Sequence, residues 1–245
     1  MYAVGISLLI TIAAYIFIGI YYLGTHRWPS SYQNKKVLFV TSHPDDECMF
    51  FGPTIRYFKD IGEVFLLCLS NGNSSGLGEV RGEELQKSAC KIGFKPQNLH
   101  VIDSPALQDD PRTDWSKEEV AGAVGRYARV CQADIVITFD SYGVSGHANH
   151  QATSRGVDHA FQDKLMPDST LLYQLESVNV IRKYSSFLDC FISSTSTVYS
   201  IGSVKDIVNI QAAMKCHSTQ LTWFRKLYVI FSRYMVVNTL KSVAL

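Results

Sequence analysis

Apolar runs alternate with helical patterns along most of the chain. Strands are predicted at residues 37–41, 64–70, 98–102, 135–139, 171–175 and 198–201, and helices at residues 50–59, 79–92, 115–131, 147–162 and 204–216. Strands that alternate with helices of about 10–15 residues are typical of βαβ units and a mainly parallel sheet. Continuous apolar strands fit a sheet that helices cover on both faces. The expected fold class is therefore α/β, a Rossmann-like three-layer domain over residues 33–220.

The N-terminal segment has a different pattern. Residues 1–25 contain no acidic residue, basic residue or histidine, and residues 2–23 are almost wholly apolar. About 20 apolar residues suffice to span a bilayer, and Trp28 with the nearby tyrosines suits a membrane interface. We therefore expect a transmembrane anchor over residues 1–25. The alternative is a cleaved signal peptide, which the missing basic region and the length of the apolar run disfavour.

The residues after this segment predict its orientation. Arg27, Lys35 and Lys36 follow the apolar run, so the positive-inside rule places the rest of the chain on the cytosolic side of a single-pass anchor. The sequon Asn73-Ser74-Ser75 could be glycosylated only in a lumenal domain. We expect it to be unmodified.

Composition changes this picture little. The chain is 18% charged with a formal net charge of +1, which gives no argument for a nucleic-acid partner. Its six cysteines are scattered without a CxxC pair, which indicates free thiols in a reducing compartment. No GxGxxG follows the first strand, so a dinucleotide site has little support.

The C-terminal segment, residues 221–245, is rich in aromatic residues and is interrupted by Arg225, Lys226 and Arg233. We expect a helix here, and the three charges argue against a second membrane span. Two interpretations are open. The helix could lie on a membrane surface, or it could pack on the core with its basic residues in water.

Two polar clusters directly follow predicted strands. His43-Pro44-Asp45-Asp46-Glu47 comes after the strand at 37–41, and His147-Ala148-Asn149-His150 comes after the strand at 135–139. Ligand and catalytic groups converge at this edge of open α/β sheets. Catalytic zinc sites commonly use three ligands drawn from histidine and acidic residues. The surplus carboxylate and imidazole could then supply the base and the donor that amide hydrolysis requires.

Each cluster has a simpler interpretation when taken alone. A His-x-x-His pair often caps a helix or faces solvent, and Asp45-Asp46 could cap and begin a helix. Two adjacent acids buried without partners would be costly, however, and a cation removes that cost. The conjunction of the clusters therefore predicts one metal site.

The two clusters also resemble those of a known family. Residues 37–47 (VLFVTSHPDDE) and 138–152 (TFDSYGVSGHANHQA) are similar to motifs of the LmbE/PIG-L superfamily of zinc-dependent de-N-acetylases, particularly its eukaryotic, membrane-anchored branch. Further similar segments are RGEELQKSACKIG (81–93), DDPRTDW (109–115) and KCHSTQ (215–220). The resemblance covers residues 36–220 in the order of the family.

This resemblance implies roles for individual residues. It implies that Zn²⁺ is bound by His43, Asp46 and His150. Asp45 would be the general base for the attacking water, and His147 would stabilise the oxyanion or protonate the departing amine. A site of this composition also accepts other divalent metals, iron and manganese among them.

Other residues of the motifs are less closely assigned. Arg81 matches a position associated with the phosphate or polar groups of the substrate. Glu47 would hold a zinc ligand in its orientation without binding the metal itself, or it would simply be an acid in the first turn of a helix. His217 lies in a C-terminal motif without an assigned contact. Some soluble relatives carry a tyrosine where this chain has Ser145, which puts one source of oxyanion stabilisation in doubt.

The resemblance implies removal of acetate from N-acetylglucosaminyl-phosphatidylinositol, an early step of GPI-anchor biosynthesis. The expected partners are this glycosylated phosphatidylinositol and the endoplasmic reticulum membrane. One alternative is a de-N-acetylase of a soluble N-acetylglucosaminide. Another is a membrane-tethered binding protein with an inactive site, although the complete set of cluster residues speaks against it.

Overall fold

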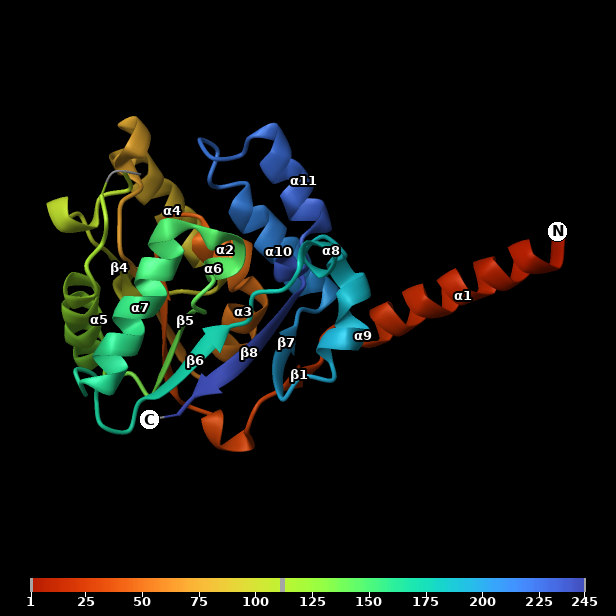
Figure 1. The fold of residues 1–245 in the computed structure, drawn as a ribbon, viewed down its shortest axis with the longest axis horizontal. Helices are drawn as coiled ribbons and strands as arrows, with labels where there is room; N and C mark the ends of the chain where they lie inside the picture. The colour runs from red at the N-terminus through yellow and green to blue at the C-terminus, as the bar shows by residue number, and fades with distance from the viewer. Residues whose placement is uncertain (1, 111–112, 245) are drawn as a thin grey trace.

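The computed structural model describes residues 2–110 and 113–244 and contains one mixed sheet in the order β1-β7-β8-β6-β5-β2-β3-β4 (Figure 1). Residues 1, 111, 112 and 245, which fall within the expected anchor, the DDPRTDW motif and the C-terminal segment, lie outside the described residues. The strands are β1 His26–Arg27, β2 Lys36–Thr41, β3 Glu63–Cys68, β4 Leu99–Val101, β5 Ile135–Phe139, β6 Leu171–Leu175, β7 Val198–Ile201 and β8 Val237–Val243. The run from β4 to β6 is parallel, and β1, β7 and β8 pair antiparallel. The expected mainly parallel α/β sheet is confirmed.

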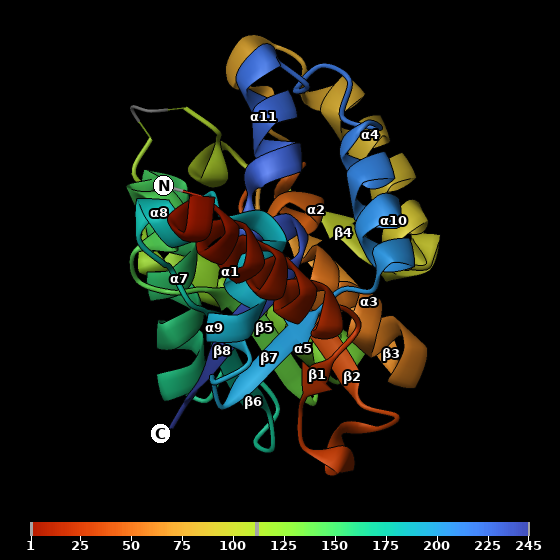
Figure 2. The same cartoon turned by 90° about the vertical axis from the view of Figure 1, so that its right-hand side faces the viewer.

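Helices cover both faces of this sheet. They are α1 Tyr2–Tyr21, α2 Asp46–Phe50, α3 Gly52–Ile61, α4 Gly78–Ile92, α5 Lys117–Cys131, α6 Gly143–Gly146, α7 Ala148–Gln162, α8 Val180–Lys183, α9 Cys190–Ser193, α10 Val204–Met214 and α11 Trp223–Phe231. Within β2, Val37 and Phe39 join one apolar core with α2, α3, α4 and α10. Leu38 and Val40 join a second core with α5 and α7. Figure 2 shows α4 and α10 on one side of the sheet and α7 on the other. The continuous apolar pattern of β2 thus reflects burial on both faces.

The C-terminal segment corrects the prediction of one helix over residues 221–245. The helix α11 ends at Phe231, and β8 follows it and inserts between β6 and β7. Residues 237–240 are all buried, where a strand can pair with β6 and β7 on its two sides. The Asn238 amide donates to the Phe50 carbonyl at 2.8 Å and accepts from the Thr54 hydroxyl at 2.9 Å. A polar residue in the middle of the sheet is therefore satisfied.

The helix α1 projects from the side of the domain that carries α8, α9 and α11 (Figures 1 and 2). Its C-terminal half is held by the Tyr15 hydroxyl, which donates to the Leu188 carbonyl at 3.1 Å. Among the described residues, no helix combines the length and apolar character needed to cross a membrane. The expected anchor over residues 1–25 is therefore not confirmed. All six cysteines are free thiols, as the sequence predicts.

Candidate active site

The turn after β2 fixes the Asp46 carboxylate. The backbone N–H groups of Ser42 and His43 donate to its Oδ2 atom at 2.9 and 2.8 Å. The other oxygen, Oδ1, lies 3.3 Å from Nε2 of His150. Burial raises the pKa of the Asp46 carboxyl, but the His150 and His43 imidazoles outweigh burial and hold that pKa below its usual range. Asp46 is thus a rigidly held carboxylate facing an imidazole.

His150 enters the site from α7, after β5. Its Nδ1 atom lies 3.1 Å from the Gly143 carbonyl, and its ring stacks on Phe139 with centroids 4.2 Å apart. Gly143 has φ +65°, and a Cβ there would lie 2.6 Å from Cβ of His150. Only glycine permits both this backbone conformation and this close approach. The contact with the carbonyl leaves Nε2 of His150 directed at Asp46.

His147 is the N-cap of α7. Its Nδ1 atom accepts the N–H of Asn149 at 3.3 Å, so the proton of the neutral ring resides on Nε2. Burial, together with the nearby His150 and His43 rings, lowers the pKa of His147 to about 4. Near pH 7 the side chain is therefore a neutral hydrogen-bond donor.

The ligand atoms of His43, His147 and His150 all lie within 4.8 Å of one another. Nε2 of His43 lies 2.9 Å from the Asn149 amide nitrogen and 3.4 Å from Oδ1 of Asp109, whereas its Nδ1 lies 3.8 Å from Asp46. Ligand atoms of a tetrahedral zinc ion with bonds of about 2.0–2.1 Å are ~3.3 Å apart. The separation between His150 and Asp46 matches this value. The pair of His150 and Asp46 therefore fits a zinc ion, and His43 and His147 lie close to this pair.

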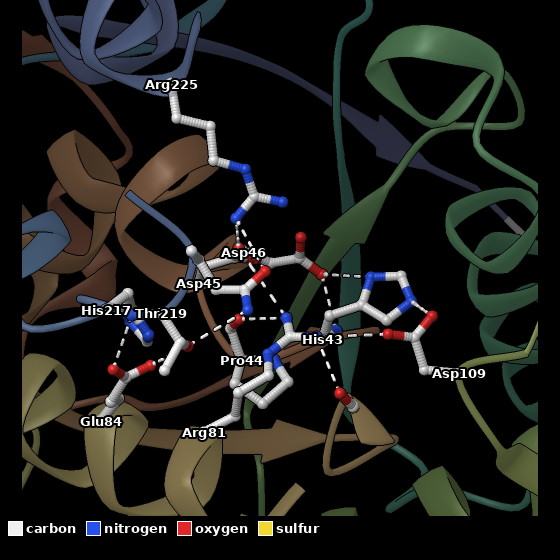
Figure 3. Close-up of polar contacts among 12 residues, drawn as sticks. His43, Pro44, Asp45, Asp46, Arg81, Glu84, Asp109, His217, Thr219 and Arg225 are labelled. Carbon is white, nitrogen blue, oxygen red and sulfur yellow. Dashed lines mark hydrogen bonds and ion pairs between the residues drawn. The ribbon is translucent and has the colours of Figure 1, made fainter. Parts of the chain in front are cut away.

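Asp45, the expected base, lies at the end of the same turn. Its φ of 124° is unusual for a residue with a side chain, and the side chain is buried. Such strain is common at functional sites. Its carboxylate pairs with Arg225 of α11, and Nη2 of Arg81 lies 3.8 Å away (Figure 3). Burial raises the pKa of Asp45 more than these cations lower it.

Arg81, the expected substrate-binding residue, is engaged by several groups of the protein itself. Its side chain is buried, and its guanidinium donates to the carbonyls of Pro44 at 2.8 Å and Gly72 at 2.9 Å. A further bond joins it to Asp109 at 3.3 Å. A Cβ at residue 72 would lie 2.5 Å from the guanidinium, so the loop requires glycine there. Because Arg81 binds protein acceptors, its role in the structure is to support the turn that carries Asp45 (Figure 3).

Glu47 lies in the first turn of α2, as one of its two interpretations predicts, and its contacts are with residues other than the three expected metal ligands. Its carboxylate lies 2.8 Å from Nε2 of His217, accepts the Ser88 hydroxyl, and accepts the N–H of Asp45 at 3.1 Å. Burial opposes charge on both partners, yet their mutual attraction lowers the pKa of Glu47 and raises the pKa of His217. Glu47 and His217 therefore form a buried ion pair behind Asp45.

Several residues of the site were not predicted from the sequence as site residues. Asn149 and Asp109 contact His43, and Arg225 contacts Asp45. Glu84 accepts the Ser218 and Thr219 hydroxyls at 2.7 and 2.6 Å, which ties the loop of His217 to α4. Asp109 and Glu84 lie inside the segments 109–115 and 81–93 that resemble the family, so the resemblance could have indicated them as site residues. Arg225 lies outside the segments that resemble the family, so nothing in the sequence indicated its contact with Asp45.

Ser145 and Tyr142 lie beside the histidine cluster rather than within its contacts. Tyr142 is exposed, and both residues line a cavity of about 560 Å³ together with Asn179 and Lys183. The cavity lies between the segment before His147 and α8. It offers room for a polar ligand next to the site.

The family model described as "PIG-L: GlcNAc-PI de-N-acetylase" matches residues 38–161, which include both clusters. The chain is 38% identical over 209 residues to the N-acetylglucosaminyl-phosphatidylinositol de-N-acetylase of Bos taurus, an alignment that covers 84% of this chain and 83% of the relative. It is 38% identical over 233 residues to the Schizosaccharomyces pombe protein named "Probable N-acetylglucosaminyl-phosphatidylinositol de-N-acetylase", covering 89% and 93%. N,N'-diacetylchitobiose deacetylase from Pyrococcus horikoshii superposes with a TM-score of 0.60 at 19% identity, over 85% of this chain and 84% of that chain. This last likeness concerns the fold alone.

Proposed function

Because this chain belongs to the PIG-L family of N-acetylglucosaminyl-phosphatidylinositol de-N-acetylases, we propose that it hydrolyses the acetamide of N-acetylglucosaminyl-phosphatidylinositol. The products are glucosaminyl-phosphatidylinositol and acetate, in an early step of GPI-anchor biosynthesis. One observation carries the proposal: the imidazoles and carboxylates of two strand ends converge within a few ångströms, beside a buried, strained Asp45.

We propose His43, Asp46 and His150 as the residues that would hold Zn²⁺. When bound, a zinc ion acidifies water and polarises a carbonyl group. The orientation of Asp46 and His150 supports this assignment, since Oδ2 of Asp46 and Nδ1 of His150 are engaged by backbone atoms, while Oδ1 and Nε2 lie 3.3 Å apart. Such outer contacts are typical of metal-binding histidines.

Asp45 acts as the base. It removes a proton from the attacking water, whose oxygen bonds to the acetyl carbon. The raised pKa of Asp45 suits this role, because a base works best when its pKa approaches the working pH. Asp45 then returns the same proton to the amine nitrogen as the carbon–nitrogen bond breaks, so that the neutral amine and acetate leave.

His147 donates a hydrogen bond to the oxyanion through Nε2. The neutral ring and the capped Nδ1 atom support this role over that of a general acid. Loss of one such donor costs about 2.7–4 kcal/mol of transition-state stabilisation.

We also propose that residues 1–25 anchor the chain in the endoplasmic reticulum membrane, with the domain facing the cytosol. The exposed apolar side chains of α1 support contact with lipid. The sequon at Asn73 is exposed and tests the orientation. In microsomes the chain should show no shift in mobility after endoglycosidase treatment, and glycosylation at Asn73 would overturn the cytosolic assignment.

Acetate release from N-acetylglucosaminyl-phosphatidylinositol tests the reaction. The zinc-loaded protein should release one acetate per free amine formed, and activity should fall on a water-soluble N-acetylglucosaminide. Preference for the soluble substrate would favour the alternative de-N-acetylase. Absence of acetate from both substrates, with zinc bound, would favour an inactive binding protein.

A further inference from the structure

The helix α11 presents two different faces. On one side, Tyr228 is buried and donates to the Met49 carbonyl at 3.2 Å, and Arg225 pairs with Asp45. The other side carries large apolar side chains with exposed fractions between 48% and 74%. These residues are Trp223, Phe224, Leu227, Ile230 and Phe231. One short helix thus connects an exposed apolar surface with the proposed base.

Two neighbouring short helices extend this surface. Val180 and Ile181 of α8 and Phe191 and Ile192 of α9 are also exposed. Tyr184, directly after α8, contacts the ring of Tyr228 of α11. All three helices lie on the side of the domain from which α1 projects (Figures 1 and 2). We refer to the exposed apolar residues of α8, α9 and α11 as the α8–α11 face.

The charges on these helices select the kind of partner. The sequences VIRK, CFIS and WFRKLYVIF contain no acidic residue and four cations, Arg182, Lys183, Arg225 and Lys226. Arg182 pairs with Asp189 and Arg225 with Asp45, whereas Lys226 is exposed. Aromatic and aliphatic side chains interspersed with cations suit the interface of an anionic lipid bilayer. The exposed apolar residues of α1 continue the same surface, which favours a membrane over a soluble protein.

We propose that the α8–α11 face docks on the lipid surface and that Arg225 then exchanges its pair with Asp45 for the phosphodiester of the lipid-borne substrate. This inference rests on the proposed function, because it assumes a glycosylated phosphatidylinositol. Arginine suits the exchange, since its guanidinium matches phosphate and carboxylate oxygens alike.

The contacts around Asp45 permit the exchange. The Arg225 side chain is 25% exposed, whereas the Asp45 side chain is only 4% exposed. Arg225 can therefore move toward solvent without unfolding its surroundings. Arg81 stays within 3.8 Å of Asp45 and continues to compensate its charge. The cavity of about 560 Å³ next to α8 accommodates polar groups of the same ligand, with Lys183 in its wall.

Quenching of tryptophan fluorescence tests the docking face. The chain has three tryptophans: Trp223 is 74% exposed, Trp115 is buried, and Trp28 is partly buried against Phe58. The full chain is reconstituted in vesicles of phosphatidylcholine and phosphatidylinositol that carry bromine on the acyl chains near the head group. We expect quenching in the wild type that is largely lost in Trp223→Phe. Equal quenching of both proteins would overturn the docking face.

Kinetics with two substrates test Arg225. The substrates are N-acetylglucosaminyl-phosphatidylinositol in vesicles and phosphate-free N-acetylglucosaminyl-inositol in solution. Arg225→Gln should lower kcat/KM for the phospholipid about tenfold or more, because contacts between charged groups are among the stronger hydrogen bonds. The loss of kcat/KM for the phosphate-free substrate should be at least tenfold smaller than the loss for the phospholipid, because that substrate has no phosphodiester for Arg225 to bind. Lys205→Gln, an exposed change on α10, should leave both values unchanged.

The outcomes separate this inference from the proposed function. An equal loss on both substrates in Arg225→Gln would contradict the exchange and assign Arg225 a purely structural role. Failure of the wild type to release acetate from the phospholipid would instead contradict the proposed function. The quenching experiment requires no turnover and stands independently of that result.

Discussion

The two sides of the site are held in different ways. On the strand side, Asp46 is fixed by two backbone N–H groups and His150 by a backbone carbonyl. On the C-terminal side, Arg225 and His217 reach the site from α11 and the loop before it, through bonds between side chains. The first arrangement is rigid because backbone atoms set it. The second can change partners, so we assign chemistry to the strand side and substrate selection to the C-terminal side.

The largest effect is expected on the strand side. His150→Gln should abolish both metal binding and acetate release, because it removes a proposed ligand from a set of three. Metal content by atomic absorption and acetate release are measured on one sample. His159→Gln, on the same helix, is the matched control and should keep both. Full activity of His150→Gln would show that the strand side does not hold the metal.

Asp109→Asn should have an intermediate effect. Asp109 contacts Nε2 of His43 and Nη1 of Arg81, and loss of such an outer contact typically lowers metal affinity or activity 10- to 100-fold. Competition with a chelator measures the affinity. The exposed Asp103→Asn serves as the control. Unchanged affinity would restrict the metal site to its direct ligands.

On the acid side of the pH profile, kcat/KM should fall about tenfold for each unit by which the pH is lowered, as expected for one essential base. The pKa of Asp45 is raised above the ordinary value of about 3.9. Asp45 therefore gains a proton, and activity falls, at a higher pH than an ordinary aspartate would give. His147, with its pKa near 4, stays neutral across this limb. Metal content is checked at each pH, and an acid limb at or below pH 4 with metal retained would contradict Asp45 as the base.

The smallest effect on activity is expected from Glu47→Gln, which should lower the free energy of unfolding by about 1–3 kcal/mol. The lowered pKa of Glu47 stabilises the fold above about pH 4.3, and this contribution is lost as pH falls through the folded pKa. The raised pKa of His217 stabilises it below about pH 6.5, and this contribution is lost as pH rises through the folded pKa.

The loss of stability in Glu47→Gln should therefore be largest between about pH 4.3 and 6.5. Urea unfolding at pH 5.5 and pH 8.5 measures the difference. Glu83→Gln, a change in an exposed pair with Lys87, is the control. A loss independent of pH would show that the pair acts through packing alone.

The contrast between the two sides also explains what the sequence could predict. The positions of β2 and β5 followed from their continuous apolar runs, and strand ends of a parallel sheet meet at one edge. The convergence of His43, Asp46 and His150 was therefore predictable. The strand β8 and the pair between Arg225 and Asp45 were not predictable. No local pattern records the pairing of β8 with β6 and β7, or an ion pair between residues 180 positions apart. The same limit led to the wrong helix over residues 237–243 and hid the protein contacts of Arg81 and Glu47.

The most direct test of the central claim is made on Asp45→Asn. Metal content and acetate release from N-acetylglucosaminyl-phosphatidylinositol are measured on the same preparation, beside the wild type. If Asp46 is the ligand and Asp45 the base, the variant keeps its metal while turnover falls by about 10²–10⁴-fold. Loss of metal from Asp45→Asn, or turnover equal to that of the wild type, would contradict this division of labour.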